Sequence, residues 1–579
     1  MQLQTFPSRE ALRRLPFTVA DVALLVGVLA LLAIVVWVGQ GMFVAFRPPD
    51  VLPSISLDPI HLPYYLLRST LRMFIALFFS FVFTFVVGGL AARNPYAERI
   101  LIPALDVLQS VPVLGFLSAT VTLFIALFPG SLLGLEAASI FAIFTGQVWN
   151  MTFSFYYSLR SLPRDLDEAA RLYRLSPWQR FWKVAVPYSM IGLLWNAMMS
   201  FGGGWFFVSA SEAITVLNND YTLPGIGAYV AEAVRQQDLR AIGFAVLAMA
   251  LMIIVVDQLL WRPLVAWADK FKFEATAADE APRSWLYDFL RTSTLPRRLS
   301  TALKSVRAQL PRPPLAFLQY ASPPPRRLGL HTQRLLDRAF NVALLTVTIA
   351  AGIGLGAFVL QGVPLGEVLH AFGLGALTLL RVFVIVVGVS LVFVPIGVAI
   401  GFNPRLARFA QPVVQFLASF PSTFLFPLAT LLFLAINLSL EIGAILLMSL
   451  GAQWYVLFNV IAGARAVPTE LREMARVFRL RKWQLWRRLI LPAIFPAWVT
   501  GALTAYGGAF NASIVAEVVS WGDHTLVASG IGAYIERATT TGDWHRIVLG
   551  VVVMTLYVVV INRLLWRRLY ALAERKYTF

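Results

Sequence analysis

Long uninterrupted apolar runs recur along the whole chain and limit what it can fold into. Two of the clearest are VALLVGVLALLAIVVWVG at residues 22–39 and VFVIVVGVSLVFVPIGVAIG at residues 382–401. A helix needs about 20 such residues to cross the hydrocarbon core of a bilayer, and the polar alternation of a membrane β-barrel is missing. Only 13% of the residues are charged, against about 25% in soluble domains. We therefore expect an all-α polytopic membrane protein, whose first apolar run is a retained spanning helix rather than a signal peptide.

The second half of the chain repeats the first. Residues that match at a spacing of 305 positions include Trp149 and Trp454, Pro163 and Pro468, Glu168 and Glu473, Gly202 and Gly507, Glu212 and Glu517, and the two GIGAY pentapeptides at 225–229 and 530–534. The first unit offers six apolar segments, at about 20–45, 69–92, 107–128, 132–158, 186–216 and 241–262. The second offers six more, near 338–361, 376–401, 412–435, 440–463, 491–519 and 547–569. An even number gives both units the same orientation, so the repeat is parallel and related by an axis along the membrane normal.

These observations predict a first unit at residues 1–262, a linker at 263–336 and a second unit at 337–579. The linker contains 12 Lys and Arg against 5 Asp and Glu, in a chain of net charge +18. Because cytoplasmic loops carry an excess of Lys and Arg, we expect the linker and both termini to be cytoplasmic. The positive charge then serves topology and contact with membrane lipid, not nucleic acid. The linker is either a simple tether, which is favoured, or an amphipathic segment lying on the membrane through residues 284–306.

A charged amphipathic segment occurs twice, as DEAARLYRLSPWQRFWKVAVP at residues 167–187 and as REMARVFRLRKWQLWRRLILP at residues 472–492. In the first copy Leu172, Leu175 and Trp178 fall three apart and form one apolar face of a short helix. Ser176 before Pro177 predicts the N-cap and first turn of a second short helix. We expect a rigid projection that keeps its apolar side on its own membrane domain and presents charges to a groove on another protein. An interfacial helix that only lies among the lipid headgroups fits the amphipathicity equally well.

This repeated segment resembles the EAA motif of ABC-importer permeases, in which Glu-Ala-Ala opens a cytoplasmic coupling helix and a Leu-Pro or similar pair follows. Glu168, Ala169, Ala170 and Pro187 match the first copy, whereas Glu473, Ala475, Leu491 and Pro492 match the second, where Met474 replaces the first Ala. The flanks resemble the nitrate, sulfonate, taurine and bicarbonate group of type I importers, and the resemblance covers both units. It implies that the residues coupling the chain to an ATPase are Glu168, Ala169, Ala170, Arg171, Arg174, Leu175, Glu473, Ala475, Arg476, Arg479 and Leu480.

The resemblance further implies a fused permease in a bacterial inner membrane, with one translocation path between its units. Its expected partners are two ATP-binding subunits and a substrate-binding protein at the external face. A P-loop needs Gly-Lys before Ser or Thr, and none of the six lysines of this chain follows a glycine. The chain is therefore expected to be a transport subunit and not an enzyme, with no cofactor of its own and with ATP and Mg²⁺ held by the partner.

One departure from the motif occurs in both copies. The family has Gly at the seventh position, where free φ eases the turn between the coupling helices, but Arg174 and Arg479 stand there. We infer a variant turn or an added contact to the partner.

Intramembrane polar residues are the candidates for the translocation path. Carboxylates inside a bilayer are costly and functional by default, so Glu212 and Glu517 are predicted to line or gate the path. A hydrogen bond that fixes each of them to a neighbouring helix is at least as well supported. Weaker candidates are Trp205, Phe510, Asn196, Asn511, Phe206, Gln109, Gln147 and Asn150, because an amide on a spanning helix more often joins helices.

Other classes of function are less well supported. A parallel-repeat secondary transporter would also have 12 helices, but it has no use for two cytoplasmic docking helices. We find no catalytic constellation, no cysteine, and five histidines without ligand spacing for a metal. The cargo stays open, since the resembled group moves small oxyanions and sulfonates but the predicted path contains no basic cluster. Asp220, Asp238, Asp523 and Asp543 are expected in external loops, where a binding protein would dock.

Overall fold

The computed structural model describes residues 19–46, 54–216, 219–271, 284–293, 295, 330–480 and 482–576. In the first unit the elements are α2 (Val19–Gln40), α3 (Leu62–Phe83), α4 (Gly89–Arg93), α5 (Pro95–Leu108), α6 (Leu117–Leu127), α7 (Leu133–Arg160), α8 (Arg164–Leu172), α9 (Pro177–Arg180), α10 (Val186–Ser211), β1 (Ala213–Val216), β2 (Asn219–Thr222), α11 (Ile226–Arg235), α12 (Leu239–Val256) and α13 (Arg262–Ala268). The linker contributes α14 (Trp285–Thr292).

The second unit follows the same order. Its elements are α16 (Leu330–Gly362), α17 (Leu365–Phe402), α18 (Pro404–Ser419), α19 (Phe426–Ala435), α20 (Leu440–Arg465), α21 (Thr469–Val477), α22 (Lys482–Leu485), α23 (Leu491–Ala516), β3 (Val518–Trp521), β4 (His524–Val527), α24 (Ile531–Thr541), α25 (Trp544–Ile561) and α26 (Arg567–Lys576). The all-α, two-unit architecture is confirmed.

Nine helices of the described chain are long and apolar enough to cross a membrane, or eleven if each of two bent pairs counts as one span. The chain is therefore a multi-pass membrane protein. The helix α7 is not among the nine, although its counterpart α20 is.

The third apolar segment of each unit differs from the prediction. Residues 107–128 were expected to form one segment, but α5 ends at Leu108 and the chain turns by 92° before residues 113–127. The second unit bends by 81° at the same place. In both units a proline stands at the break in extended conformation, Pro112 with ψ 118° and Pro421 with ψ 112°, and a proline cannot continue the hydrogen-bond ladder of the preceding helix.

An Asn-Pro pair, at residues 94–95 in the first unit and 403–404 in the second, begins the first helix of each bent pair. The side chain of Asn94 accepts hydrogen bonds from the backbone N–H groups of Tyr96 and Ala97, and Asn403 caps α18 in the same way. Each proline then occupies the first helical position, where its missing N–H costs nothing. The helix α5 therefore starts at residue 95, twelve residues before the predicted apolar segment at 107–128.

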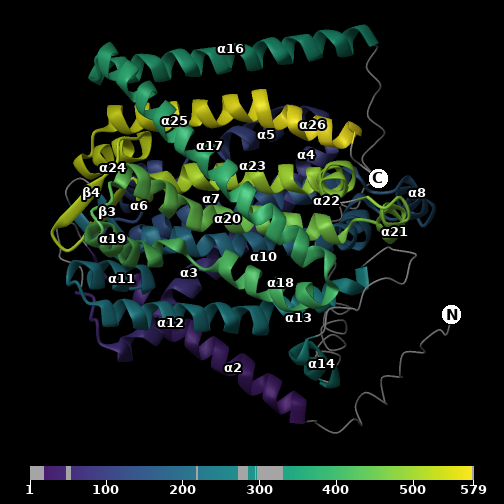
Figure 1. The fold of residues 1–579 in the computed structure, drawn as a ribbon, viewed down its shortest axis with the longest axis horizontal. Helices are drawn as coiled ribbons and strands as arrows, with labels where there is room; N and C mark the ends of the chain where they lie inside the picture. Colours follow the sequence, from purple (N-terminus) through teal and green to yellow (C-terminus); the bar gives the residue numbers. More distant parts are fainter. Residues whose placement is uncertain are drawn as a thin grey trace, which may run out of the picture.

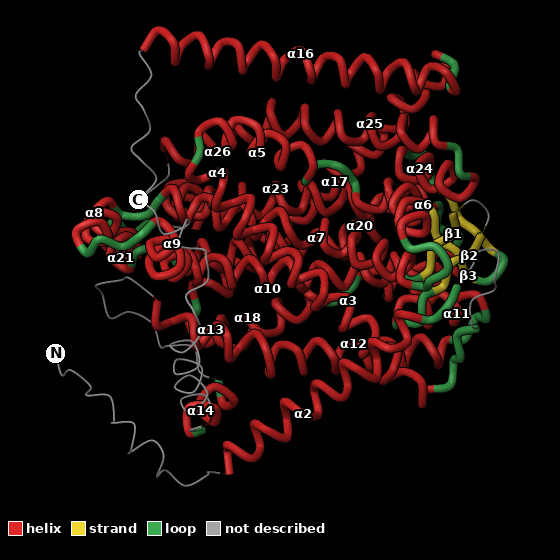
Figure 2. Tube along the Cα trace, turned by 180° about the vertical axis from the view of Figure 1, so that it is seen from behind, coloured by secondary structure: helices red, strands yellow, loops and turns green. Residues whose placement is uncertain are grey.

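Two short antiparallel hairpins, which the sequence did not predict, follow the fifth long helix of each unit. The strand β1 pairs with β2 from Ala213 opposite Thr222, and β3 pairs with β4 from Val518 opposite Val527. Figures 1 and 2 show the hairpins at one end of the molecule and α8 and α21 at the other. We call these the hairpin end and the coupling end. The start of α2 and the end of α26 lie toward the coupling end (Figure 1).

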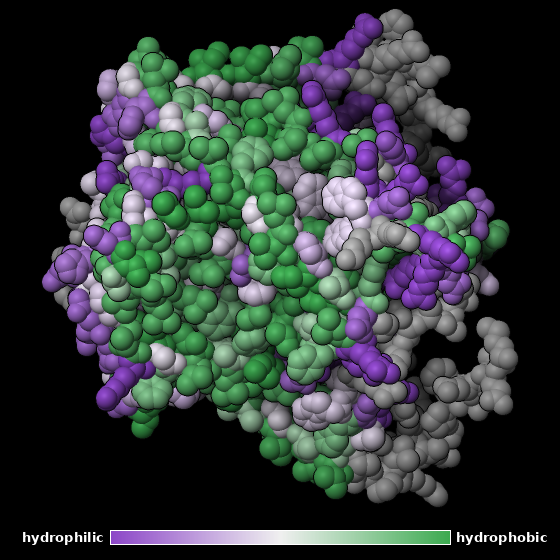
Figure 3. All heavy atoms as spheres, in the orientation of Figure 1, coloured by the Kyte–Doolittle hydropathy of each residue, from purple (hydrophilic) through white to green (hydrophobic). Residues whose placement is uncertain are grey.

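A hydrophobic band separates the two ends, as Figure 3 shows in green between two polar margins. Inside the band, α3, α7 and α10 pack together in the first unit, and α17, α20 and α23 pack together in the second. Only 6% of the most apolar stretch of α2, and of that of α16, is buried, so these helices form the outer edges of the molecule (Figure 1). The units join through a common core in which Val113 and Leu114 lie among residues of the second unit.

The described part of the linker docks on the first unit. The helix α14 contacts α2 and α13, and Asp21 in the first turn of α2 accepts hydrogen bonds from Ser293 Oγ at 2.6 Å and from the Leu295 N–H at 2.8 Å. Most of residues 263–336, and therefore the predicted linker boundaries, lie outside the described residues.

Candidate functional site

Each unit carries a projection at the coupling end, made of two short helices and the turn between them. In the first unit α8 is followed by α9, whose N-cap is Ser176 as expected. The Ser176 hydroxyl accepts from the Gln179 N–H at 3.2 Å, and the Gln179 side chain accepts from the Ser176 N–H at 3.0 Å. This capping box satisfies two backbone donors that the start of a helix leaves open. We call α8–α9 and α21–α22 the two projections.

The turns of the two projections are equivalent. Arg174 has φ 51° and Arg479 has φ 47°, which is the left-handed region that favours glycine. The Leu175 N–H donates to Ala170 O at 3.0 Å, and the Leu480 N–H donates to Ala475 O at 3.0 Å. Each arginine thus adopts the conformation suited to the family's glycine, so the turn is not altered. The other inference, an added contact to a partner, stays a prediction.

The side of each projection that packs on the membrane domain is narrower than predicted. Ala170 and Ala475 are buried, and Leu175 is half-buried. Leu172 was expected on the same inward face, but it is 83% exposed because it closes α8 at the tip, and Trp178 is 52% exposed. The expectation that all three apolar residues face inward is therefore wrong for two of them.

The tips of the projections are apolar and their flanks are charged. Tyr173, Val477 and Phe478 are exposed like Leu172. The charged and small positions of the predicted coupling set divide by exposure: Glu168, Arg171, Arg174, Glu473, Arg476 and Arg479 are exposed, whereas Ala169 and Leu480 are half-buried. A protruding apolar tip with charges around it has the form of a plug for a groove.

The two projections differ in charge at five paired positions, which are 164/469, 167/472, 176/481, 177/482 and 180/485. In the first, Asp167 forms ion pairs with Arg171 at 2.6 Å and with Arg180 at 3.4 Å. In the second, Arg472 replaces that aspartate, donates to Ala464 O at 3.0 Å and lies over the Phe402 ring at 4.5 Å. The second projection is consequently the more basic one.

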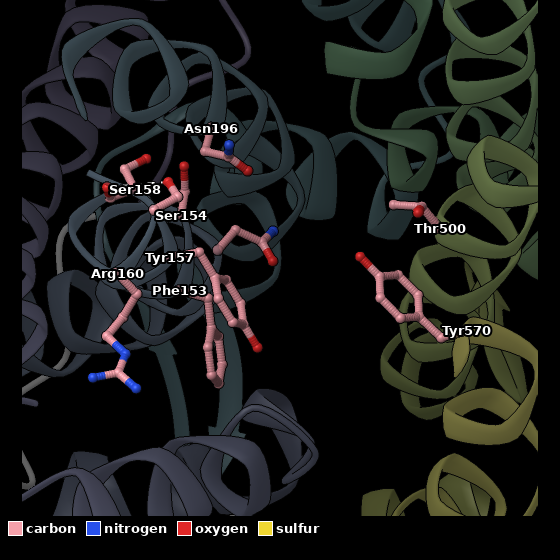
Figure 4. A pocket seen from close by; sticks show the side chains of 10 residues that line it. Phe153, Ser154, Tyr157, Ser158, Arg160, Asn196, Thr500 and Tyr570 are labelled. Carbon is pink, nitrogen blue, oxygen red and sulfur yellow. Dashed lines mark hydrogen bonds between the residues drawn. The ribbon is translucent and has the colours of Figure 1, made fainter. Parts of the chain in front are cut away.

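A cavity of about 750 Å³ opens between the two units (Figure 4). The first unit lines it with Asn150, Phe153, Ser154, Tyr157, Ser158, Arg160, Ser161 and Asn196, and the second with Thr500 and Tyr570. The lining is made of hydroxyls, amides, aromatic rings and one arginine, with no carboxylate. Arg160 stands at the end of α7, next to the first projection, so the cavity lies toward the coupling end.

Glu212 and Glu517 do not line this cavity. Glu212 is fully buried; it accepts from Arg72 Nη1 at 2.6 Å, Ser69 Oγ at 2.5 Å and the Gly227 N–H at 2.7 Å. Arg72 also binds Glu136 at 2.6 Å, and Arg68 binds Glu136 as well. We call Arg68, Arg72, Glu136 and Glu212 the first ion cluster. It joins α3, α7, α10 and α11 inside one unit.

The second unit contains a smaller cluster. Glu517, also fully buried, accepts from Thr378 Oγ1 at 2.7 Å, from Arg381 Nη1 at 2.9 Å and from the Ala533 N–H at 3.1 Å. Arg381 also pairs with Glu441, whose side chain is 48% exposed. These three charged residues are the second ion cluster. The geometry of both clusters supports the alternative that these carboxylates tie helices together.

The remaining path candidates are divided. Asn196 lines the cavity, but Trp205 and Phe510 are buried in the cores of their own units, where they pack on Phe201 and Tyr506. Asn511 crosses between units, because its side-chain oxygen accepts from the Val113 N–H at 3.1 Å. Of the other amides named from the sequence, Asn150 lines the cavity and Gln147 is buried.

Several residues at these sites were not predicted from the sequence. Ser154 and Ser158 follow Asn150 at intervals of four, which places all three on one helix face, and this spacing was a usable signal. Arg72 and Arg381 lie within apolar segments, where a charged side chain is expected to pair with an opposite charge. Among the described residues, no group of three or more His, Cys, Asp or Glu could hold a metal ion.

Two parallel units, a charged projection on each at one end, and a polar cavity between them define a two-unit membrane permease. The chain belongs to the family of binding-protein-dependent transport system inner membrane components, whose sequence profile matches residues 81–260 and again residues 392–578. It is thus a fused ABC-importer permease of type I, as the resemblance implied.

Three curated relatives are similar to it. The chain is 27% identical to the bicarbonate transport system permease protein CmpB of Synechococcus elongatus over 228 residues, 39% of this chain and 73% of that protein. It is 30% identical to the putative aliphatic sulfonates transport permease protein SsuC of Bacillus subtilis, over 27% of this chain and 54% of that protein. It is 25% identical to the nitrate import permease protein NrtB of Leptolyngbya laminosa, over 33% of this chain and 64% of that protein.

Proposed function

We propose that this chain is the membrane subunit of an ATP-driven importer of a small oxyanion, and that each projection docks into one of two separate ATP-binding subunits. The observation that carries the proposal is the pair of equivalent projections on one face of the molecule. A single interfacial helix would need no second copy in the same turn geometry. ATP and Mg²⁺ are then bound by the partner and not by this chain.

This proposal sets the orientation of the chain. The coupling end is cytoplasmic, and the hairpin end faces the outside of the inner membrane, where a substrate-binding protein delivers the solute. Both termini are cytoplasmic because the first and last described helices have their outer ends at the coupling end (Figure 1). The excess of Lys and Arg in and around the projections supports the same orientation.

The mechanism follows from the way the projections are joined to the membrane helices. A short π-helical segment, Phe181–Ala185, connects α9 directly to α10, and Trp486–Ile490 connects α22 to α23. No flexible loop intervenes, so a movement of either projection is transmitted to a helix of its own unit. When ATP draws the two subunits together, the projections approach each other and the cavity at the coupling end closes. Nucleotide binding thus shifts the equilibrium between a state in which the path is open to the cytoplasm and a state in which it is open to the outside.

Two observations support an oxyanion as the solute. The relatives named above are for bicarbonate, aliphatic sulfonates and nitrate, each of which carries negatively charged oxygens. The cavity presents hydroxyl and amide groups with Arg160 and without a carboxylate. Hydrogen-bond donors in a positively biased site stabilise an anion.

The docking is tested by purifying the complex of this chain with ATP-binding subunits from its own cell. The Glu168→Lys, Glu473→Lys double variant reverses one exposed charge on each projection and should lose the ATPase. The control Asp523→Lys makes the same reversal at the hairpin end, where the residue is also exposed, and should retain it. If no ATPase binds the wild-type chain and uptake follows an ion gradient, a secondary transporter replaces the importer.

A further inference from the structure

The two units line the cavity unequally (Figure 4). We infer that, within the chain, the first unit supplies most of the hydrogen-bond donors to the solute, through Asn150, Ser154 and Ser158 on α7 and Asn196 on α10. The second unit acts as the wall that closes over the solute. This inference rests on the proposed function, since it takes the cavity to be the path of a small oxyanion.

The polar groups on α7 are arranged as a ladder. Asn150, Ser154 and Ser158 are spaced by four residues and therefore lie one above the other on one face of the helix. None of these three side chains has a hydrogen-bond partner in the described part of the chain. Asn196 uses one N–H for Gly192 O at 2.9 Å and retains a second. Unpartnered donors in a cavity are the groups that a polar ligand would satisfy.

The equivalent positions in the second unit lack this ladder. A shift of 305 residues carries Asn150, Ser154, Ser158 and Asn196 to Tyr455, Asn459, Gly463 and Gly501. Two of these are glycines without a polar side chain. The other two, Tyr455 and Asn459, do not line the cavity, and Asn459 donates its amide to Tyr455 O at 2.8 Å within its own helix.

Close packing of α20 on α23 is what the glycines provide. A Cβ added to Gly463 would lie 2.5 Å from Ala497 Cβ, and one added to Gly501 would lie 2.8 Å from Tyr455 O. In the first unit the exchange is reversed: Gly192 on α10 faces Ser154 and Ser158 on α7, with a Cβ there 3.3 Å from the Ser154 hydroxyl. The glycine that allows close packing is thus on α10 in the first unit, and the counterpart of Gly463 on α7 is the hydroxyl-bearing Ser158.

Of the two polar residues that the second unit contributes, Thr500 is the less available. The Thr500 hydroxyl donates to Pro496 O at 3.1 Å, within α23. Tyr570 stands on α26 and faces the ladder from across the cavity (Figure 4). The charge of the lining comes from Arg160, also a residue of the first unit, whose side chain is 56% exposed and lies 3.8 Å from Glu98. Most of the donors and the positive charge are therefore on the same side.

The absence of cysteine from the chain makes the ladder directly testable in the purified protein. Ser154→Cys and Ser158→Cys are compared with Asn459→Cys, at the position matched to 154, and with Ser520→Cys, an exposed position at the hairpin end. Each variant reacts with an anionic reagent, sulfonatoethyl methanethiosulfonate, and with the cationic trimethylammonioethyl analogue. The ratio of the two rates reports the potential at each site.

We expect the cysteines at 154 and 158 to react, with the anionic reagent favoured about fivefold relative to Ser520→Cys, as one nearby positive charge in a wet cavity would give. Asn459→Cys should react at least tenfold more slowly. Nitrate, the probe anion, should slow the reaction at 154 and leave that at 520 unchanged. Equal reactivity of the two units, or a preference for the cation at 154, overturns the inference. This measurement uses the chain without an ATPase. Its outcome is therefore independent of the docking experiment, so failure of the inference can be distinguished from failure of the proposed function.

Discussion

At the residue scale, the left-handed arginines of the projections combine a conformational cost with an exposed side chain. A non-glycine residue in this region costs about 1–2 kcal/mol, and two copies of that cost are retained in the chain. Strain that is kept twice at the same place is a reason to expect a function for the side chain. The added contact to an ATPase, inferred from the sequence, fits that reasoning.

We predict that Arg479→Gly stabilises the protein by about 0.5–1 kcal/mol, since relief of strain exceeds the extra freedom of glycine in the unfolded chain. Thermal unfolding in detergent measures this change. Arg476→Gly, in α21 and equally exposed, should instead destabilise by about 1 kcal/mol. The same Arg479→Gly protein should bind the ATPase more weakly, and unchanged binding would show that Arg479 makes no added contact with it.

The two ion clusters differ in charge balance, and this predicts unequal effects of the same substitution. Removing the charge of Glu212 leaves Arg68 and Arg72 with only Glu136, whereas removing that of Glu517 leaves Arg381 paired one-to-one with Glu441. We expect Glu212→Gln to cost about 3 kcal/mol, because a buried charge loses its partner, and Glu517→Gln to cost about 1 kcal/mol. The unfolding midpoints of the two variants under one set of conditions decide the matter. Equal losses would show that the charge count of the cluster is irrelevant.

At the element scale, the GIGAY pentapeptides are explained by the corner between α10 and α11 and its copy between α23 and α24. A Cβ on Gly225 would lie 2.2 Å from the Glu212 carboxyl, and one on Gly530 would lie 2.2 Å from that of Glu517. The first glycine of each pentapeptide therefore leaves room for the carboxylate of the ion cluster. The repeat is visible in the sequence but this contact is not, because 13 residues separate the glycine from the glutamate along the chain.

We predict that Gly225→Ala strongly destabilises the protein, by about 2–3 kcal/mol, because the added methyl meets a buried carboxylate that cannot move without losing its hydrogen bonds. The control is Gly243→Ala in α12, where a Cβ would meet nothing within 4 Å. That substitution should be neutral or stabilise by up to about 1 kcal/mol through helix propensity. The yield of folded protein and the unfolding midpoint measure both effects.

A carboxyl at the hairpin end gives the protein a pH dependence. Burial raises the pKa of Glu536, on α24, from 4.5 to about 7. The folded state therefore binds a proton more tightly than the unfolded state, so the stabilising effect of that proton is complete below pH 4.5 and is lost as the pH rises toward 7. The first unit has Ala231 at the equivalent position and lacks this group.

Replacing Glu536 by Gln should abolish this component. Between pH 5 and pH 8 the unfolding midpoint of the wild-type protein should fall relative to that of Glu536→Gln, and the variant should be the more stable of the two at pH 8. A constant difference across this range would show that the carboxyl does not titrate there.

At the scale of the whole molecule, the two units are joined by contacts that do not involve the linker. Asn511 binds the backbone of Val113, and Arg567 of α26 pairs with Asp106 of α5. The shared core around Val113 and Leu114 adds apolar contact between the units. We predict that a chain cut within the proline-rich stretch at residues 310–316, with both halves expressed together, still purifies as one complex.

Co-purification of the untagged half with the tagged half checks this. The Asn511→Ala, Arg567→Ala variant of the cut protein should release part of the untagged half, while the same changes in the uncut chain should have little effect. Separation of the unmodified halves would show that the linker does more than tether, contrary to the favoured expectation from the sequence.

Much of this architecture was predictable because it depends on local composition. The apolar runs and the capping signal at Ser176 can be recognised within a few residues. The 305-residue repeat can be recognised by aligning the two halves of the chain. The bends at Pro112 and Pro421 were harder, because the apolar composition continues through them and hides the break. The residues of the translocation path were the least predictable. Glu212 and Asn196 are polar residues in or next to the same long helix, α10. Only the positions of α3 and α7 show that Glu212 binds an arginine and that Asn196 lines the cavity.

The first ion cluster also dictates how the chain can be made. Arg68 and Arg72 emerge from the ribosome first, Glu136 follows Arg72 by 64 residues and Glu212 by 140. At about 5–20 residues per second, Arg72 has no counter-charge for roughly 3–13 s and an incomplete one for roughly 7–28 s. A helix with two unneutralised guanidinium groups is a poor substrate for release into lipid. Biogenesis of this protein therefore requires that α3 be retained by the insertion machinery until α7 has been synthesised, so that helices enter the bilayer as a group and not one by one.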